Sequence, residues 1–230
     1  MNWKPFYTLW LSLAIAISSA EAASWEVGAY GGITLPSTTN VRQQIPDQAV
    51  DLNWQHAYAH TSGTWGVLAT HWHGWAGLEW GVQAEVQRFD FDLKNQHTIR
   101  TFTKHGKTFT TDEDLNPHRT DVTLLAINVL LRKDFRWIKP YVGGGGGLAL
   151  ADTRSWDYFN EHVQPSDQSD MSMAPFWQVI GGVSLPIYSG WSVFSQYKFT
   201  HSQHAFDFSG ATTSWTIEAH HVLGGVTYTF

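Results

Sequence analysis

Apolar and polar side chains alternate along most of this chain with a period of two residues. In the segment 25–35, one face is mostly apolar and the opposite face carries Glu, Gly, Tyr and Thr, and segments 75–91 and 220–230 alternate similarly. A period of two is that of a β-strand, so the pattern predicts an all-β protein. Because the second face mixes Gly, Gln, Glu and Thr, the pattern favours a barrel with a narrow polar interior and lipid outside over a soluble sandwich.

The composition excludes several classes of protein. Only 15% of the 230 residues are charged, whereas a soluble domain usually has about 25%. Hydrophobic residues reach 43%, which argues against disorder, and the net charge of −6 argues against a nucleic-acid partner. The chain has no cysteine, which excludes a disulfide scaffold and zinc bound by thiolates.

Residues 1–22 have the pattern of a secretory signal peptide. Lys4 precedes an apolar run at residues 6–17, and small residues follow up to Ala22. The apolar run is shorter than the roughly 20 residues that a membrane-spanning helix needs. We therefore expect cleavage after Ala22 and a barrel domain over residues 23–230. No later stretch is apolar for about 18 residues, so we expect no membrane-spanning helix downstream.

The connections between the predicted strands alternate in length. We predict eight strands, at residues 25–35, 64–72, 75–91, 119–132, 137–151, 174–187, 191–203 and 216–230. The short connections are 73–74, 133–136 and 188–190, and the long ones are 36–63, 92–118, 152–173 and 204–215. An even strand count with short turns at one end and long loops at the other is typical of antiparallel up-and-down barrels of the Gram-negative outer membrane.

Aromatic residues recur at the short-turn end of these strands. Rings with an apolar body and a polar tip settle at the level of lipid headgroups, so we expect them to form an aromatic girdle. The residues predicted for this girdle are Trp72, Trp75, Trp137, Trp191, Tyr228 and Phe230.

Several segments resemble the opacity-type, OmpA-like family of outer-membrane barrels. The segments are DVTLLAINVLLR at 121–132 with KPYVGGGGG at 139–147, GGVSL at 181–185 with SQYKFT at 195–200, and VLGGVTYTF at 222–230. The resemblance implies a small eight-stranded barrel whose terminal strand, with Tyr228 and Phe230, is recognised by the barrel-assembly machinery. It implies little about activity, because the same barrel hosts adhesins, structural anchors and enzymes.

An eight-stranded barrel leaves an interior that side chains can fill. The polar residues predicted to point inward are Glu79, Gln83, Glu85, Asn128, Arg132, Gln178, Gln196 and Lys198. Buried charges need partners, so Glu79 and Glu85 are expected to pair with Arg132 and Lys198. We favour a structural plug over a gated polar pathway. The glycine run 143–147 lacks the Lys-Ser/Thr of a phosphate loop and is expected to allow close strand approach.

Histidine is unusually frequent, with 12 residues, most of them in predicted loops or at strand ends. A metal or haem site would require several imidazoles to converge. His71 and His73 share a strand face, which is only a weak ligand pattern. We expect no cofactor and no metal.

An enzyme hypothesis rests on the segment 199–204. One relative of this barrel class is a lipid A deacylase with a His-x-Ser motif in the penultimate strand and a carboxylate in the last. Here His201 and Glu218 match, but Gln203 occupies the position of the serine. His201 and Ser202 must point to opposite sides of a strand, so they cannot form a nucleophile–base pair. We expect no enzymatic activity and keep a lipid A-modifying hydrolase as the alternative.

The long loops are the expected working surface, because long loops on a rigid scaffold are disproportionately functional. The prediction is a non-enzymatic surface protein with a role in envelope integrity, adhesion or host interaction. Its expected partners are outer-membrane lipid and lipopolysaccharide, with a host or matrix ligand at the loops. A small-solute pore is the third hypothesis.

Overall fold

The computed structural model describes residues 21–45, 50–75, 77–94, 96–104, 107–115, 118–156, 167–208 and 211–230. Nearly all of the predicted signal peptide lies outside these residues, so its cleavage stays a prediction. Among the described residues, no helix is long and apolar enough to cross a membrane.

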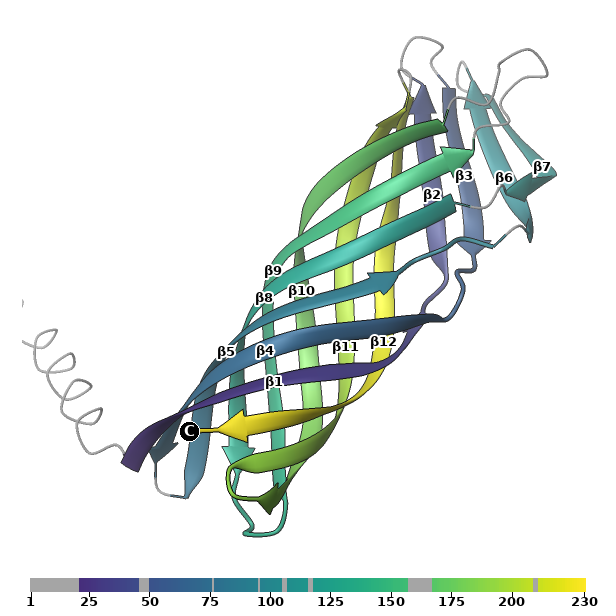
Figure 1. The fold of residues 1–230 in the computed structure, drawn as a ribbon. Helices are drawn as coiled ribbons and strands as arrows, with labels where there is room; N and C mark the ends of the chain where they lie inside the picture. The colour runs from purple at the N-terminus through teal and green to yellow at the C-terminus, as the bar shows by residue number, and fades with distance from the viewer. Residues whose placement is uncertain are drawn as a thin grey trace, which may run out of the picture.

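The described residues form twelve strands and no helix, rather than the eight strands predicted. All the strand pairs are antiparallel (Figure 1). The strands are β1 (Glu21–Pro36), β2 (Thr39–Ile45), β3 (Val50–Ala57), β4 (Ser62–Trp75), β5 (Leu78–Asp90), β6 (Gln96–Lys104), β7 (Lys107–Leu115), β8 (His118–Lys133), β9 (Lys139–Trp156), β10 (Asp167–Tyr188), β11 (Trp191–Phe208) and β12 (Ala211–Thr229).

Eight of these strands overlap the predicted segments, and their pairings run in a circuit. The order is β1, β4, β5, β8, β9, β10, β11 and β12, and β12 pairs with β1 again. The last residue takes part in this pairing, because Phe230 and Trp25 exchange backbone hydrogen bonds of 3.0 and 3.3 Å. We call the end where β4–β5, β8–β9 and β10–β11 connect the short-turn end, and the opposite end the hairpin end.

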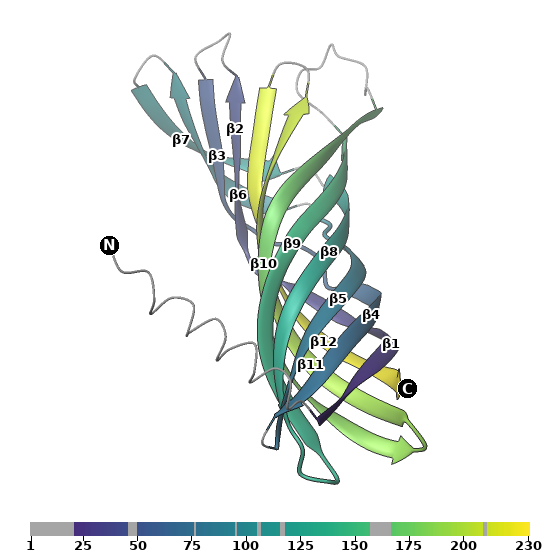
Figure 2. The same ribbon diagram turned by 90° about the vertical axis from the view of Figure 1, so that its left-hand side faces the viewer.

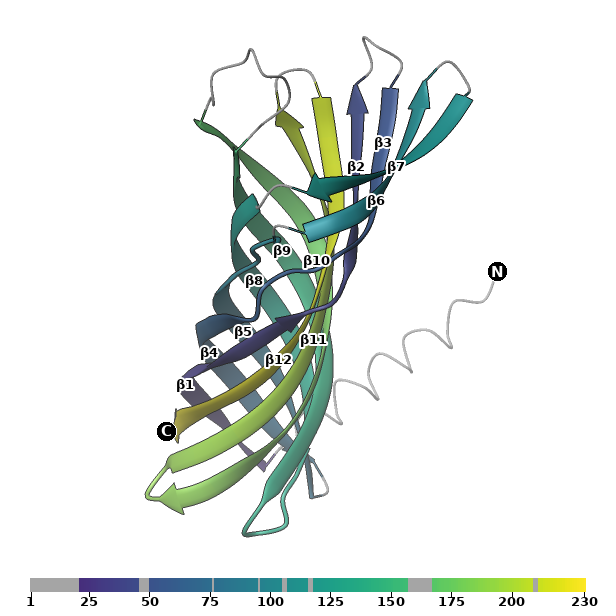
Figure 3. The same ribbon diagram turned by 90° about the vertical axis from the view of Figure 1, so that its right-hand side faces the viewer.

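The four unpredicted strands arise in two segments that were expected to be loops. The hairpins β2–β3 and β6–β7 continue the sheet outward from β12 and project at the hairpin end (Figures 2 and 3). β12 reaches back to Ala211, whereas β1 ends at Pro36, opposite Ala219. The part of β12 beyond β1 therefore has a free edge, and β2 pairs with it over Thr212 to Trp215. Long-range edge pairing of this kind has no local sequence signal.

Apolar side chains cover the outside of the circuit of eight strands. Val129 and Val142 are 59% and 61% exposed there, while their inward neighbours Asn128 and Tyr141 are buried. The alternation in the sequence therefore corresponds to an apolar outer face and a largely polar inner face. Such a surface is suited to lipid rather than to water.

Exposed aromatic rings gather at the short-turn end. Trp137, Trp191, Tyr228 and Phe230 point outward as predicted, with Trp137 77% exposed. Trp72 contradicts the prediction, because it is buried inside the circuit. Its position in the alternation along β4 places it on the inner face, where the guanidinium of Arg132 lies over its ring. The side chain of Trp75 lies outside the described part of the chain.

Two glycine features shape this scaffold. The predicted turn at 73–74 is wrong, because β4 continues to Trp75 and β5 begins at Leu78, with Gly77 at a φ of 75° that favours glycine. In the run 143–147, a Cβ on Gly147 would lie 1.9 Å from the backbone oxygen of Leu125. Close approach of β8 and β9 explains the run, as the sequence indicated.

Candidate functional site

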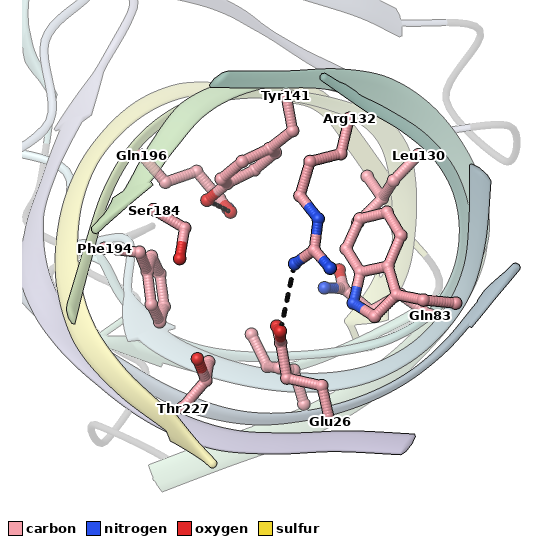
Figure 4. A pocket seen from close by; sticks show the side chains of 11 residues that line it. Glu26, Gln83, Leu130, Arg132, Tyr141, Ser184, Phe194, Gln196 and Thr227 are labelled. Atoms are coloured by element: carbon pink, nitrogen blue, oxygen red, sulfur yellow. Dashed lines mark hydrogen bonds and ion pairs between the residues drawn. The ribbon is translucent and has the colours of Figure 1, made fainter. Parts of the chain in front are cut away.

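Arg132 closes the interior near the short-turn end. Its Nε donates to Glu79 Oε2 at 2.5 Å. Its Nη1 donates to Glu26 Oε2 at 3.1 Å (Figure 4). The guanidinium also lies 3.8 Å from the centroid of the Trp72 ring. Arg132 is 5% exposed, so two carboxylates and an aromatic face replace its water.

Space on either side of Arg132 differs greatly in size. Towards the short-turn end lies an open vestibule of about 350 Å³, lined by Arg132, Lys139, Glu79 and the β10–β11 turn. On the inner side, a smaller cavity of about 20 Å³ lies between Arg132, Gln83, Tyr141 and Gln196 (Figure 4). This volume is about that of a single water molecule.

Glu85 is the centre of a buried polar network at the next level. Lys198 and Tyr30 both donate to its Oε1, and Lys198 is fully buried. Its Oε2 accepts from Asn128 Nδ2 at 3.0 Å and from Gln178 Nε2 at 3.1 Å. Both carboxylate oxygens are thus occupied, which is the condition under which a buried ion pair is tolerated.

His221 extends the network towards the hairpin end. Its Nδ1 contacts Thr34 Oγ1 at 2.9 Å and Gln87 Nε2 at 3.2 Å, and its Nε2 contacts Thr200 Oγ1 at 3.0 Å. Gln87 Oε1 accepts from Lys198 Nζ at 2.9 Å, so His221 and Glu85 belong to one connected network.

Beyond this network the interior becomes apolar. A cluster of buried side chains joins the hairpin end of the circuit to β2 and β3, and we call it the apolar cluster. Its members are Val41, Leu52, Trp54, Ala57, Phe89, Phe91, Leu93, Val122, Leu124, Ala126, Ala149, Ala151, Phe176, Phe206, Trp215 and Ile217. The hairpin β2–β3 therefore packs on the barrel interior instead of extending freely into solvent.

The structure brings all the predicted interior residues to the inner face. Arg132 lies with Glu79, and Lys198 lies with Glu85. Gln83, Asn128 and Gln178 join the Glu85 network, while Gln196 Oε1 accepts from Tyr141 at 2.9 Å. The residues that sequence reasoning did not select are Glu26, Tyr30, Gln87 and His221. Their strand parity indicated the inner face, but no sequence signal indicated their partners.

The outer face at the hairpin end carries a His–Glu pair. His201 Nδ1 lies 2.9 Å from Glu218 Oε1, and the His201 ring stacks on Trp177 with centroids 5.4 Å apart. Ser202 points to the opposite, inner face, where it is buried and lies 3.0 Å from His204 Nε2. The two halves of a serine triad are thus on different sides of the sheet, as their parity predicted.

The Ser202–His204 pair lies within β11, which continues to Phe208 into the segment 204–215 that was predicted to be a loop. His204 is 2% exposed, and its Nδ1 has no hydrogen-bond partner among the described residues. A general base needs its second nitrogen oriented by an acceptor, which this histidine lacks.

His71 and His73 are packed as aromatic rings. Their centroids are 4.4 Å apart, and they continue a series from Trp25 to Trp80 with spacings of 4.6 and 4.5 Å. Among the described residues, no group of three or more His, Asp or Glu side chains has the arrangement of a metal site.

The predicted assembly signal lies on the outer face of the closing strand. Tyr228 packs on Trp191 with ring centroids 5.1 Å apart, and Phe230 is 67% exposed. Recognition of these residues by assembly machinery stays a prediction.

Comparisons with known proteins relate the chain to outer-membrane barrels by fold alone. No protein-family model and no curated protein sequence matches it. The outer membrane protease OmpT from Escherichia coli has a TM-score of 0.54 and 7% identity, covering 92% of this chain and 98% of that chain. Neisserial surface protein A, with a TM-score of 0.46 and 11% identity, is matched over 91% of this chain and 100% of that chain. OprG from Pseudomonas aeruginosa has a TM-score of 0.46 and 11% identity over 89% and 95% of the two chains.

Proposed function

We propose that the chain is a non-enzymatic surface protein of the Gram-negative outer membrane, in which an eight-stranded barrel carries an extracellular binding sheet. The circuit β1–β4–β5–β8–β9–β10–β11–β12 is the transmembrane barrel, with the short-turn end in the periplasm. The observation that supports this proposal best is the continuation of the barrel sheet through β2, β3, β6 and β7 at the hairpin end.

The apolar cluster anchors the inner part of this extension, and the outer part presents side chains for contact. Ile99 of β6 and Phe109 of β7 are 53% and 57% exposed, although they lie beyond the apolar band of the barrel. Large apolar side chains outside the membrane have no lipid to cover them, which favours a protein or matrix ligand. We infer a role in adhesion or host interaction for this surface.

The test is to replace residues 96–115 by a short glycine–serine turn and to measure adhesion of expressing cells to matrix-coated and epithelial surfaces. We expect a loss of at least several-fold, with unchanged heat-dependent gel mobility showing that the barrel still folds. The double variant Ile99→Ala/Phe109→Ala should reproduce part of the loss, while the lipid-facing control Val129→Ala should not. Undiminished adhesion of all variants would refute the proposal.

The proposal also includes the export of the chain and its assembly into the membrane. We infer that residues 1–22 are removed on export, and that the barrel-assembly machinery recognises the terminal strand with Tyr228 and Phe230. Membership of the opacity-type, OmpA-like family rests on the sequence resemblance. Contacts with lipopolysaccharide follow from the apolar outer face.

A lipid A-modifying hydrolase is the second candidate, and the His201–Glu218 pair favours it. Glu218 Oε1 lies 2.9 Å from His201 Nδ1 and can orient the ring, but Ser202 is buried on the opposite face of the strand. The test is the mass spectrum of lipid A from cells with and without the protein. Loss of one acyl chain, abolished by His201→Ala, would support hydrolysis, and an unchanged spectrum supports the surface-binding role.

A small-solute pore is the third candidate, and the paired side chains across the interior argue against it. Arg132 is bound by Glu26 and Glu79, Lys198 is bound by Glu85, and the cavity beside Arg132 has a volume of only about 20 Å³. We infer that the interior is a structural plug. Planar-bilayer recordings should show no conductance steps, and reproducible steps would overturn the plug.

A further inference from the structure

The strand β7 forms an open edge of the sheet. It is the last strand in the sheet order, and among the described residues β6 is its only paired strand. The β6–β7 pairing runs from Gln96–Leu115 to Lys104–Lys107 without a register shift, and β7 contains no proline. A regular edge without a bulge or proline offers its free N–H and C=O groups to another strand.

This edge also lacks cover on both faces. The side chains of residues 107–112 are all exposed, so neither face of this part of β7 packs on the barrel. Residues 100–104 of β6 pair with β3, and Phe102 packs against the apolar cluster, so β6 is anchored while β7 has β6 as its only paired strand among the described residues. Two-stranded ribbons are marginally stable in water, so an additional strand would stabilise this part of the sheet.

The β7 sequence, KTFTTDEDL, is complementary to itself in one antiparallel register. When two copies pair with Thr110 opposite Thr110, Lys107 of each copy stands opposite Glu113 of the other. Phe109 then stands opposite Thr111, which gives the exposed ring a cross-strand neighbour. If the two strands paired about Phe109 or Thr111 instead of Thr110, both Lys–Glu pairs would be lost. Parallel in-register pairing would place Lys107 opposite Lys107.

We propose that the β7 strands of two copies of this chain pair antiparallel about Thr110 and join their extracellular sheets into one. The proposal deepens the proposed function, because it rests on the extracellular position of the extension and names a second copy of the chain as its partner. A two-fold axis relates the copies, so each contact forms twice. The copies lie on one cell or on two facing cells, and differently tagged cell populations distinguish these arrangements.

The experiment uses the absence of cysteine from the chain. Thr110→Cys places a single thiol at the two-fold axis, where directly opposite residues lie within reach of a disulfide. Cells expressing the full-length variant are treated with a mild oxidant, and a non-reducing gel should show that most of the protein is a covalent dimer. The matched control is Asn53→Cys on β3, which has strands on both sides and should remain monomeric.

Charge reversal provides a second test in the Thr110→Cys background. Lys107→Glu or Glu113→Lys alone should reduce the dimer several-fold, and the double variant should restore it. Lys133→Glu, in the distant short-turn region, should have no effect. The proposal would be overturned if no covalent dimer formed either within one cell population or between mixed populations. It would also be overturned if Asn53→Cys gave as much covalent dimer as Thr110→Cys, or if the double variant did not restore the dimer.

The outcomes also separate this proposal from the proposed function. If replacement of residues 96–115 abolishes adhesion while Thr110→Cys stays monomeric, the surface-binding role stands and self-pairing is wrong. If Thr110→Cys dimerises while the replacement leaves adhesion to matrix and cells unchanged, self-pairing stands and the adhesive role is wrong.

Discussion

The two halves of the barrel interior are built from the same strands, but the buried ion pairs of the described residues lie in the half towards the short-turn end. Towards the short-turn end, Arg132 and Lys198 are held by carboxylates inside hydrogen-bonded networks. Towards the hairpin end, buried apolar side chains such as Phe89 and Phe206 pack with residues of β2 and β3. Strand parity decides which residues face inward, but the chemistry of those residues decides whether electrostatics or packing stabilises each half.

This contrast has a consequence for the extension at the hairpin end. A charged interior could not hold the apolar undersides of β2 and β3, because unpaired charges would be buried against them. The apolar cluster instead gives Val41, Leu52 and Trp54 a surface to pack on. The filling of the interior thus determines which end of the circuit can support the additional strands β2 and β3.

The largest expected effect comes from breaking the buried pair of the polar half. Lys198→Ala leaves the Glu85 carboxylate without its cation, and we expect a loss of about 4 kcal/mol in the free energy of unfolding. Urea unfolding in detergent micelles measures it. The double variant Lys198→Met/Glu85→Gln should recover most of the loss, because the remaining groups are neutral. Equal destabilisation by the single and double variants would mean that packing, rather than charge, matters here.

A packing defect tests the apolar half. Phe89→Ala removes a side chain that is 2% exposed in the apolar cluster, and we expect a loss of about 3 kcal/mol. Limited proteolysis should also cut the β2–β3 hairpin faster, because its packing surface is damaged. The matched control, Val86→Ala on the outer face of β5, should leave the proteolysis rate unchanged. If both variants behave alike, the cluster does not anchor the hairpin.

A smaller effect is expected at Arg132. Arg132→Ala leaves Glu26 and Glu79 without their shared cation, but the Glu79 side chain is 26% exposed and can regain water. We therefore expect a loss of about 2 kcal/mol in the free energy of unfolding. Lys133→Ala, next in sequence and exposed, is the control and should be neutral. Unchanged stability of Arg132→Ala would count against its role in closing the interior.

The sequence predicted the inner face well and the extension poorly. Alternation correctly places Glu85 and Lys198 inside, since parity along a strand is a local property. The pairing of β2 with β12 joins residues more than 160 positions apart, and it depends on β1 ending before β12 does. Trp72 was wrongly assigned to the aromatic girdle, because its position near a turn was given more weight than its position in the inward–outward alternation of the strand. Glu26 was on the correct face, but its contact with Arg132 depends on the curvature of the circuit.

The smallest expected effect is at His204, which is 2% exposed and lies 3.0 Å from Ser202 Oγ through its Nε2. Its Nδ1 has no hydrogen-bond partner among the described residues, and a buried polar atom without a partner lowers stability. The ring therefore stabilises the fold less than its burial alone would suggest.

His204→Gln keeps a group able to bond Ser202, and we expect the free energy of unfolding to change by no more than about 1 kcal/mol. Urea unfolding in detergent micelles measures this change, with the exposed Lys133→Ala as the control. A loss as large as that expected for Phe89→Ala would mean that packing of the ring, rather than its contact with Ser202, stabilises the fold at this position.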